Sequence, residues 1–356
     1  MMDVLKFVFA IFAVLAGIDR ITGNHFKLGQ EFEKGIQAAG TLSLAMVGML
    51  CIAPSLANFL TPVLRPIASW LQIDPSFIGG FIANDMGGAS VARELAENAM
   101  LGGYHGLIVA SMMGVTICFT IPVSLKIIDE VYHREVLNGI LCGIAALPVG
   151  CVVSGLVLGI PFFTLLLNLV PVLVVALVTC VGLILKPEIC CKCFAGIGVL
   201  VSAIITVGLA AGVFTYLTGI ELIPHMLPAR EGFLIVCDIA IMLSGIFPLI
   251  KMISRCFHKA FAAAGRKMGI DEASVLGLVS SLANSIPAFH LIEKMNPKGR
   301  MMNMAFAVSA SFVFGDHLAF TMAFDEAFLS AMIIGKLTSG IAAVVLVHFI
   351  HKDSGK

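Results

Sequence analysis

The sequence predicts an all-α protein that crosses a membrane repeatedly, with about nine spanning helices and two broken helical segments. Hydrophobic residues make up 59% of the chain and charged residues only 12%, whereas soluble domains carry about 25% charged residues. Apolar runs of twenty or more residues recur along the whole chain. A run of that length is enough to span a bilayer as a helix, which predicts a polytopic membrane protein.

The predicted spans follow from the apolar runs and from the polar or proline-rich stretches between them. The first span, 4–18, is short and lacks a small-residue cleavage site, so we interpret it as retained and not as a signal peptide. Three prolines predict an interfacial connector over 61–75. The remaining predicted spans are 36–60, 106–128, 136–159, 162–185, 194–218, 232–254, 301–324 and 328–350.

The segment 76–92 is apolar enough to enter a membrane but is interrupted at its centre. It carries Asn84 and Asp85 between two Gly-Gly pairs. Each glycine weakens a helix by about 1 kcal/mol relative to alanine, and an intramembrane carboxylate is seldom without a function. Interrupted backbone at membrane depth survives only inside protein or beside a wet cavity. The segment therefore predicts a transport site; the alternative is a loosely packed helix pair that Asp85 caps.

A second interrupted segment, 273–292, occurs in the later part of the chain. It contains Ser281, the pair Asn284-Ser285 and a proline. Polar, Gly- or Pro-interrupted segments at corresponding positions of two inverted halves are the best sequence indication of a central substrate site. We therefore expect the two interrupted segments to meet near mid-membrane.

The basic residues set the predicted orientation. Five Lys and Arg residues place the loop 251–272 in the cytoplasm. If 273–292 crossed the membrane, the basic residues after it would lie outside, so it is expected to enter and return. The same argument, applied to the basic loop 19–35, makes 76–92 re-entrant. The alternative is eleven plain spanning helices. That topology would twice place a basic loop outside, against the preference of Lys and Arg for cytoplasmic loops.

Re-entrant segments give the chain two halves of opposite orientation within a single integral membrane unit. The predicted N-terminal half is 1–160, the connecting span is 161–190 and the C-terminal half is 191–356. Each half contains two spans, one broken segment and two further spans. This arrangement leaves the C-terminus in the cytoplasm.

Other polar residues occur inside predicted spans. Asp316 and His317 are adjacent and could share a proton or form a structural hydrogen bond. Asp238 is either functional or solvated near an interface. Asp85, Asp238 and Asp316 are expected to have no Lys or Arg at comparable depth, which favours a cation or a neutral polar solute over an anion.

Several function classes are not expected. The formal net charge is zero, which gives no indication of nucleic-acid binding. Cys190, Cys191 and Cys193 lack a partner cluster, so no metal or other cofactor is predicted. Asp238 and Asp316 could form an aspartyl dyad, but the glycine pattern of intramembrane aspartyl proteases is absent, as are HExxH and GxSxG. We do not expect an enzyme.

The stretches GGFIANDMGGASVARELAENAMLGGYHG (79–106) and LANSIPAFHLIEKMNPKGRMMNMAFAVSASFVFGDHLAF (282–320) resemble the ethanolamine-utilisation membrane proteins, the EutH family. The resemblance covers essentially the whole chain. It implies a multi-pass permease or facilitator of the bacterial inner (plasma) membrane that supplies ethanolamine for catabolism in the cytoplasm. The alternative function is cation-coupled transport of another small polar solute, such as a nucleoside or an amino acid.

The candidate site residues come from the residue patterns alone. Those expected to bind substrate are Asn84, Asp85, Asn284, Ser285, Asp316 and His317, with Asp238 and Ser281 as secondary candidates. Asp85 and Asp316 are expected to pair with the ammonium group, and the amides and hydroxyls to bond the substrate hydroxyl. The expected partners are ethanolamine and the lipid bilayer, and homo-oligomer formation is left open.

Overall fold

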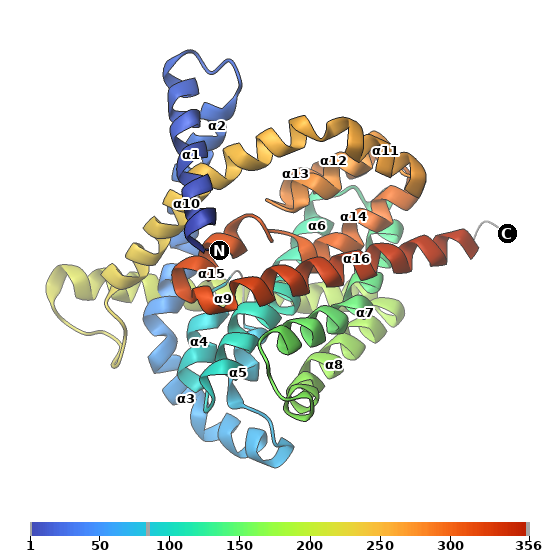
Figure 1. The fold of residues 1–356 in the computed structure, drawn as a ribbon. Helices are drawn as coiled ribbons and strands as arrows, with labels where there is room; N and C mark the ends of the chain where they lie inside the picture. Colours follow the sequence, from blue (N-terminus) through green and yellow to red (C-terminus); the bar gives the residue numbers. More distant parts are fainter. Residues whose placement is uncertain (1, 83–85, 354–356) are drawn as a thin grey trace.

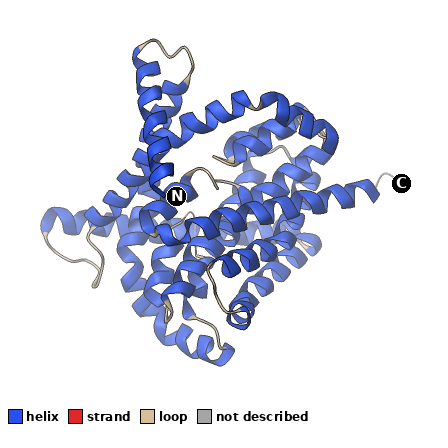
Figure 2. Ribbon diagram, viewed as in Figure 1, coloured by secondary structure: helices blue, strands red, loops and turns tan. Residues whose placement is uncertain are grey.

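The computed structural model describes residues 2–82 and 86–353, and the regular structure in this part of the chain is entirely helical (Figure 1, Figure 2). Seven helices within it are long and apolar enough to cross a membrane. The predicted class, an all-α polytopic membrane protein, is confirmed. The seven are Leu28–Leu71, Ala99–Ile127, Glu130–Val157, Phe162–Leu185, Pro187–Thr218, Ala229–Cys256 and Glu326–His351.

Several spans are built from consecutive helical pieces. The pieces as far as residue 157 are α1 (Met2–Ile21), α2 (Leu28–Leu42), η1 (Ser43–Val47), α3 (Gly48–Leu71), η2 (Pro75–Gly80), α4 (Gly88–Leu95), α5 (Ala99–Gly103), η3 (Tyr104–Gly114), η4 (Thr116–Thr120), α6 (Ile121–Ile127), η5 (Glu130–Tyr132) and α7 (His133–Val157). The pieces after it are α8 (Phe162–Leu185), α9 (Pro187–Thr218), α10 (Ala229–Cys256), α11 (His258–Met268), α12 (Glu272–Ser281), α13 (Ile286–Leu291), η6 (Ile292–Lys294), α14 (Pro297–Ala310), α15 (Asp316–Phe324), η7 (Glu326–Phe328) and α16 (Leu329–Asp353).

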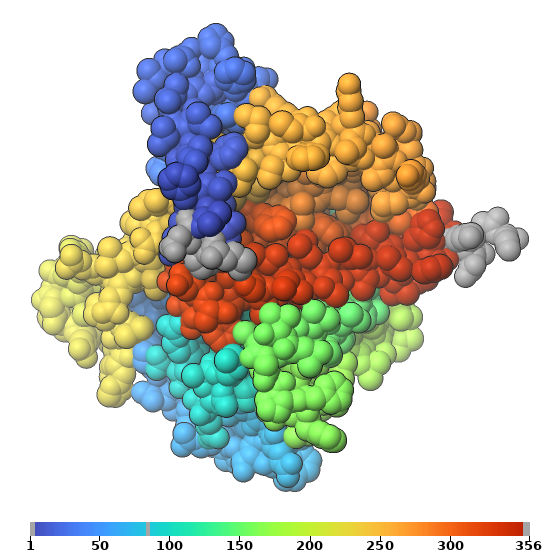
Figure 3. Space-filling model, viewed as in Figure 1, coloured from blue at the N-terminus to red at the C-terminus, as the bar shows by residue number. Residues whose placement is uncertain are grey.

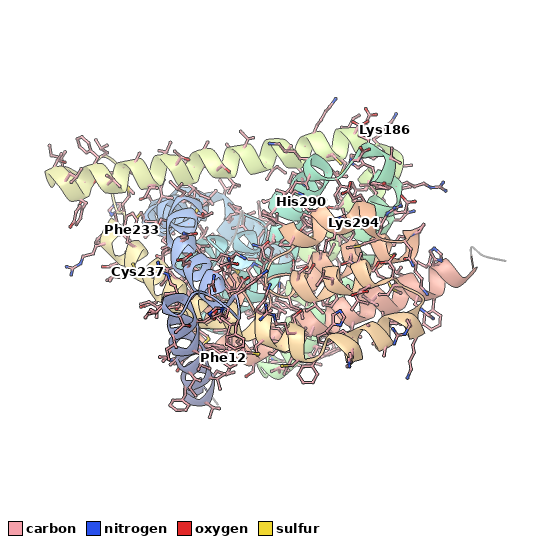
Figure 4. All side chains as sticks on the ribbon, turned by 90° about the horizontal axis from the view of Figure 1, so that it is seen from above. Phe12, Lys186, Phe233, Cys237, His290 and Lys294 are labelled. Atoms are coloured by element: carbon pink, nitrogen blue, oxygen red, sulfur yellow. The ribbon has the colours of Figure 1, made fainter. Side chains whose placement is uncertain are left out.

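The bundle is centred on helices from both ends of the chain. Helix α16 packs along α7 and α14, and α10 packs against α1, α2 and α15. The α1–α2 pair projects from the main body (Figure 3). Helix α9 runs along one edge, beginning next to Lys186 (Figure 4). The most deeply buried span is Ala99–Ile127, in which η3 and η4 are π-helical.

The predicted connector over 61–75 is wrong, because α3 continues to Leu71 with Pro54, Pro62 and Pro66 inside it. Proline in a helix interior removes a backbone hydrogen bond and costs about 3 kcal/mol. Membrane helices tolerate it where neighbouring groups satisfy the freed carbonyls. The side chain of Trp70 remains 83% exposed near the end of this helix.

The predicted span 301–324 is also wrong as a single helix. Helix α14 ends at Ala310 and α15 begins at Asp316. Between them Phe312 has a φ of 62°, in the left-handed region, which stops a right-handed helix. The predicted first span, 4–18, lies within α1, which is not among the seven candidate spans.

Candidate functional site

The segment 273–292 forms a helical hairpin whose arms are α12 and α13. The arms pack against each other. The Asp271 carboxylate holds the two ends together. One oxygen accepts 2.8 Å hydrogen bonds from the backbone N–H and the hydroxyl of Ser274, and the other accepts one from the Asn296 backbone N–H. Because Asn296 starts α14, the chain enters and leaves this hairpin at the same end.

The segment 76–92 also forms a helical hairpin, and its two arms, η2 and α4, pack against each other. The buried carboxylate of Asp74 accepts hydrogen bonds from the N–H groups of Ser76 (2.9 Å), Glu97 (3.1 Å) and Asn98 (2.9 Å). The arms approach so closely that a Cβ on Gly79 would lie 2.7 Å from the Gly88 carbonyl oxygen. The predicted site residues Asn84 and Asp85 fall between the arms and lie outside the described residues.

The tip of the second hairpin is hydrogen-bonded to the break between α14 and α15. The Phe312 N–H donates to the Ser281 carbonyl oxygen at 2.9 Å, and the Phe314 N–H donates to that of Leu282 at 2.8 Å. A Cβ on Gly315 would lie only 2.1 Å from the Ala283 carbonyl oxygen. Two interrupted backbones therefore satisfy each other inside the bundle, as membrane depth requires.

This contact brings a predicted site residue of the segment 273–292 close to one of the predicted span 301–324. Asn284 follows Ala283, and Asp316 follows Gly315, so the two predicted residues flank the closest backbone approach. Asn284 is half-buried, and its Oδ1 accepts a 2.9 Å hydrogen bond from the Ile286 N–H. Asp316 is half-buried in the first turn of α15.

Buried side chains surround the same place. The hydroxyls of Ser281 and Ser285 are buried and have no hydrogen-bond partner within residues 2–82 and 86–353. His317 is 1% exposed, and its ring centroid lies 5.2 Å from that of Phe312. Unsatisfied buried hydroxyls are costly, so such groups commonly bond a buried water or a polar ligand. They suit a site that binds a small polar molecule.

The secondary candidate Asp238 is not brought into this group. It lies on an exposed face of α10, where its neighbours Val236 and Ile239 point into the core. The adjacent Cys237 lies well away from the second hairpin's His290 and Lys294 (Figure 4). The orientation of Asp238 fits a solvated carboxylate near an interface better than a site ligand.

A cavity leads to the hairpin tip. It has a volume of about 410 Å³ and lies between α2, α10 and α12. Asn284, Ala283 and Pro287 line its inner wall. Charged groups lie at its other wall, where Glu31 pairs with Lys34 at 3.0 Å and with Lys251 at 3.7 Å. The cavity therefore connects one charged end of the bundle with a predicted site residue.

Residues 1–350 match the family described as "Ethanolamine utilisation protein, EutH". The chain belongs to the EutH family. The predicted family resemblance is thereby confirmed. No solved structure matches this EutH-family chain.

Curated relatives of this EutH-family chain are similar over nearly its whole length. A protein of Listeria monocytogenes named "Probable ethanolamine permease EutH" is 44% identical, over 97% of this chain and 92% of that protein. The protein of Salmonella typhimurium with the same name is 36% identical, over 99% and 96%. The "Uncharacterized protein YxeR" of Bacillus subtilis is 37% identical, over 96% and 92%.

One prediction about charge is wrong for this EutH-family chain. Lys336 of α16 has no exposed surface, and its Nζ donates a 2.6 Å hydrogen bond to the Ser111 carbonyl oxygen. A basic residue thus lies deep in the bundle, where only acids were expected. The pattern of a single Lys within an apolar run, IIGKLTSGIAAVVL, is visible in the sequence. The balance of charges alone therefore does not favour a cationic substrate.

Sequence reasoning also missed buried hydroxyls in this EutH-family chain. Thr120 of η4 and Thr321 of α15 are fully buried, and their hydroxyls have no hydrogen-bond partner among the described residues. Threonine hydroxyls commonly bond a carbonyl of their own helix, as Thr116 does with Met112 at 2.6 Å. No sequence signal separates the satisfied threonine from the unsatisfied ones.

Proposed function

We propose that this protein carries ethanolamine across the bacterial inner membrane into the cytoplasm, by facilitated diffusion or by secondary transport, for ethanolamine catabolism. Membership of the EutH family and relatives named as probable ethanolamine permeases support the substrate. The observation that carries the proposal is the polar contact between the second hairpin and the α14–α15 break, at the inner end of a cavity. Discontinuous helices of this kind form the substrate sites of many transporters.

The proposed site uses groups of complementary chemistry. The Asp316 carboxylate pairs with the ammonium group of the substrate, and Asp85 is proposed to do the same from the first segment. Ethanolamine's hydroxyl bonds the amide of Asn284 and the hydroxyl of Ser285, whose buried oxygen otherwise lacks a partner within the described residues. This assignment requires the tips of the two segments to meet near mid-membrane, as the sequence predicts.

We propose further that 1–160 and 191–356 are inverted halves joined by 161–190, with both hairpins re-entrant and the C-terminus in the cytoplasm. The matching hydrogen bonds of Asp74 and Asp271 support this topology. The cavity beside Lys251 then opens to the cytoplasm, since the basic loop after α10 lies on that side.

The test is uptake of labelled ethanolamine into proteoliposomes, with and without a proton or sodium gradient. Wild type, Asn284→Ala and Ser285→Ala are compared with Asn58→Ala, a matched control on an exposed face of α3. Saturable uptake that falls at least tenfold in Asn284→Ala, about 1.4 kcal/mol, and stays normal in Asn58→Ala is expected.

One result distinguishes the two modes of transport, and another contradicts the proposal. Equilibration without accumulation under every gradient means a facilitator. Folded, inserted wild type that takes up no ethanolamine contradicts the proposal, and competition with nucleosides and amino acids then tests the alternative substrates.

A further inference from the structure

Lys336 is a buried basic residue beside the proposed site. It lies on the last span, and its Nζ hydrogen bond to the Ser111 carbonyl oxygen joins α16 to the π-helical segment η3. Its amino group lies close enough to His317, the residue after Asp316, to influence the charge on that imidazole. On the following turn of α16, the Ser339 hydroxyl donates to the Ser309 hydroxyl at 2.7 Å, just before the α14–α15 break. Lys336 therefore lies about one turn from the contact between α16 and the end of α14, where the break begins.

No carboxylate within residues 2–82 and 86–353 forms a salt bridge with Lys336. The titratable groups that face it are the Cys151 thiol from α7 and the His317 imidazole from α15. Tyr104 of η3 adjoins them and donates a 3.1 Å hydrogen bond to the Cys151 carbonyl oxygen.

Among the described residues, the other elements packed against α16 contribute the Asp316 carboxylate from α15 and otherwise neutral or distant groups. Helix α14 contributes Ser309, and its Lys298 lies towards the far end, where it bonds Met268 and His348. Glu326 of η7 is exposed and pairs with Lys6 at 3.2 Å. Within residues 2–82 and 86–353, Lys336 thus has one neutral carbonyl as hydrogen-bond acceptor, where an ammonium can donate three hydrogen bonds.

Two cations in one buried site repel each other strongly, because the low dielectric of the interior does little to screen them. An ammonium substrate at Asp316 and a protonated Lys336 would compete for the same negative potential. Lysine can lose its charge by giving up a proton, and buried lysines do so readily. A quaternary ammonium or a guanidinium group keeps its charge, because neither can give up a proton under these conditions.

We propose that Lys336 is a proton-exchange residue of the transport site: ethanolammonium binds only when the Lys336 amine has lost its proton to solvent. The Nζ–H bond breaks, the electron pair stays on the nitrogen, and the proton leaves as the substrate charge arrives. The net charge of the site stays constant through the cycle, and the cation is exchanged for a proton. This inference rests on the proposed ethanolamine transport and gives it a coupling mechanism.

The experiment measures ethanolamine binding to full-length purified protein by calorimetry, between about pH 6 and pH 8. The neutral variant is Lys336→Gln, whose amide N–H can still donate to the Ser111 carbonyl. The charged variant is Lys336→Arg. The control is Lys294→Gln, at an exposed lysine of η6 on the second hairpin (Figure 4).

In wild type and in the control, the apparent Kd is expected to rise about tenfold for each unit that the pH falls, because the binding-competent fraction falls by that factor. In Lys336→Gln the Kd is expected to be independent of pH. In Lys336→Arg binding is expected to weaken at least a hundredfold at every pH. The conservative variant is thus the more damaging one, which a purely structural role would not produce.

Two outcomes overturn the proposal without touching the proposed function. If Lys336→Gln keeps the wild-type pH dependence, the proton comes from the substrate and neutral ethanolamine is bound. If Lys336→Arg binds ethanolamine as well as wild type, the site tolerates a second cation. If wild type binds and transports no ethanolamine at all, the proposed function itself fails. Should Lys336→Gln not fold, Lys336→Met supplies the neutral side chain.

Discussion

Asp74 and Asp271 close two separate hairpins with the same kind of hydrogen bonds. Each carboxylate accepts from a backbone N–H early in the first arm and from the backbone N–H of the asparagine that begins the next helix, Asn98 or Asn296. Each asparagine then caps that helix with its own side chain. A carboxylate that accepts several N–H groups is well suited to a tight backbone junction.

The likeness extends further along the chain. Ser76 in the first hairpin bonds His105 at 2.8 Å, through its hydroxyl. In the second, Asn303 donates to the Ser274 carbonyl oxygen at 2.9 Å. In both cases a polar residue on the helix that follows the capping asparagine holds the first arm of the hairpin in place. The correspondence supports the proposed inverted halves.

Replacing Asp74 by alanine is expected to destabilise the protein by about 3 kcal/mol, because one buried and two half-buried hydrogen bonds lose their charged acceptor. The measurement is the thermal unfolding midpoint of the purified protein in detergent. Asp129→Ala is the matched control, since Asp129 caps η5 at an exposed position. Equal midpoints for the two variants would show that Asp74 does not hold the hairpin.

Gly315→Ala is expected to lower uptake at least tenfold. Its Cβ would lie 2.1 Å from the Ala283 carbonyl oxygen, so the hairpin tip must move away from the break. Forced overpacking of this kind costs about 1–3 kcal/mol. Gly17→Ala is the control, because a Cβ there meets nothing within 4 Å. Normal uptake by Gly315→Ala would mean that the contact is unimportant for transport.

The two intramembrane acids are expected to differ. Asp316→Asn should lower ethanolamine uptake by at least tenfold, since the ammonium group loses its counter-charge. Asp238→Asn should change uptake by less than about twofold, because the side chain lies on an exposed face. Initial rates in proteoliposomes, normalised to the amount of inserted protein, measure both. The reverse ranking would move the cation site towards α10.

The cavity can be probed by thiol labelling. In a background without native cysteines, Ser280→Cys should react with a membrane-impermeant reagent from the cytoplasmic side, since Ser280 lines the cavity. Ethanolamine should slow the reaction severalfold if it occupies the inner wall at Asn284. Ser90→Cys in the first hairpin is buried and should not react. Labelling of Ser280→Cys from the outside only would invert the proposed orientation.

The sequence predicted the class and the two interruptions, because both depend on composition and local backbone chemistry. Glycine pairs and an Asn-Ser-x-Pro sequence weaken a helix wherever they occur. The third interruption, at Ser311–Gly315, was missed because its apolar sequence reads as continuous helix. Only the acceptors at Ser281 and Leu282 make the break favourable. Conversely, Pro62 and Pro66 contributed to the predicted connector over 61–75, yet both lie inside the continuous helix α3.

The sequence by itself determined that this protein is a many-span helical membrane protein of the EutH family with polar residues at two helix breaks. The tertiary structure decided which polar residues lie close together. Asn284 lies near Asp316. Asp238 is exposed, and Lys336 is buried in the bundle. Hydropathy is a sum over neighbouring residues, whereas a binding site depends on the rotation of each helix about its axis. That rotation is fixed by packing against helices distant in the sequence.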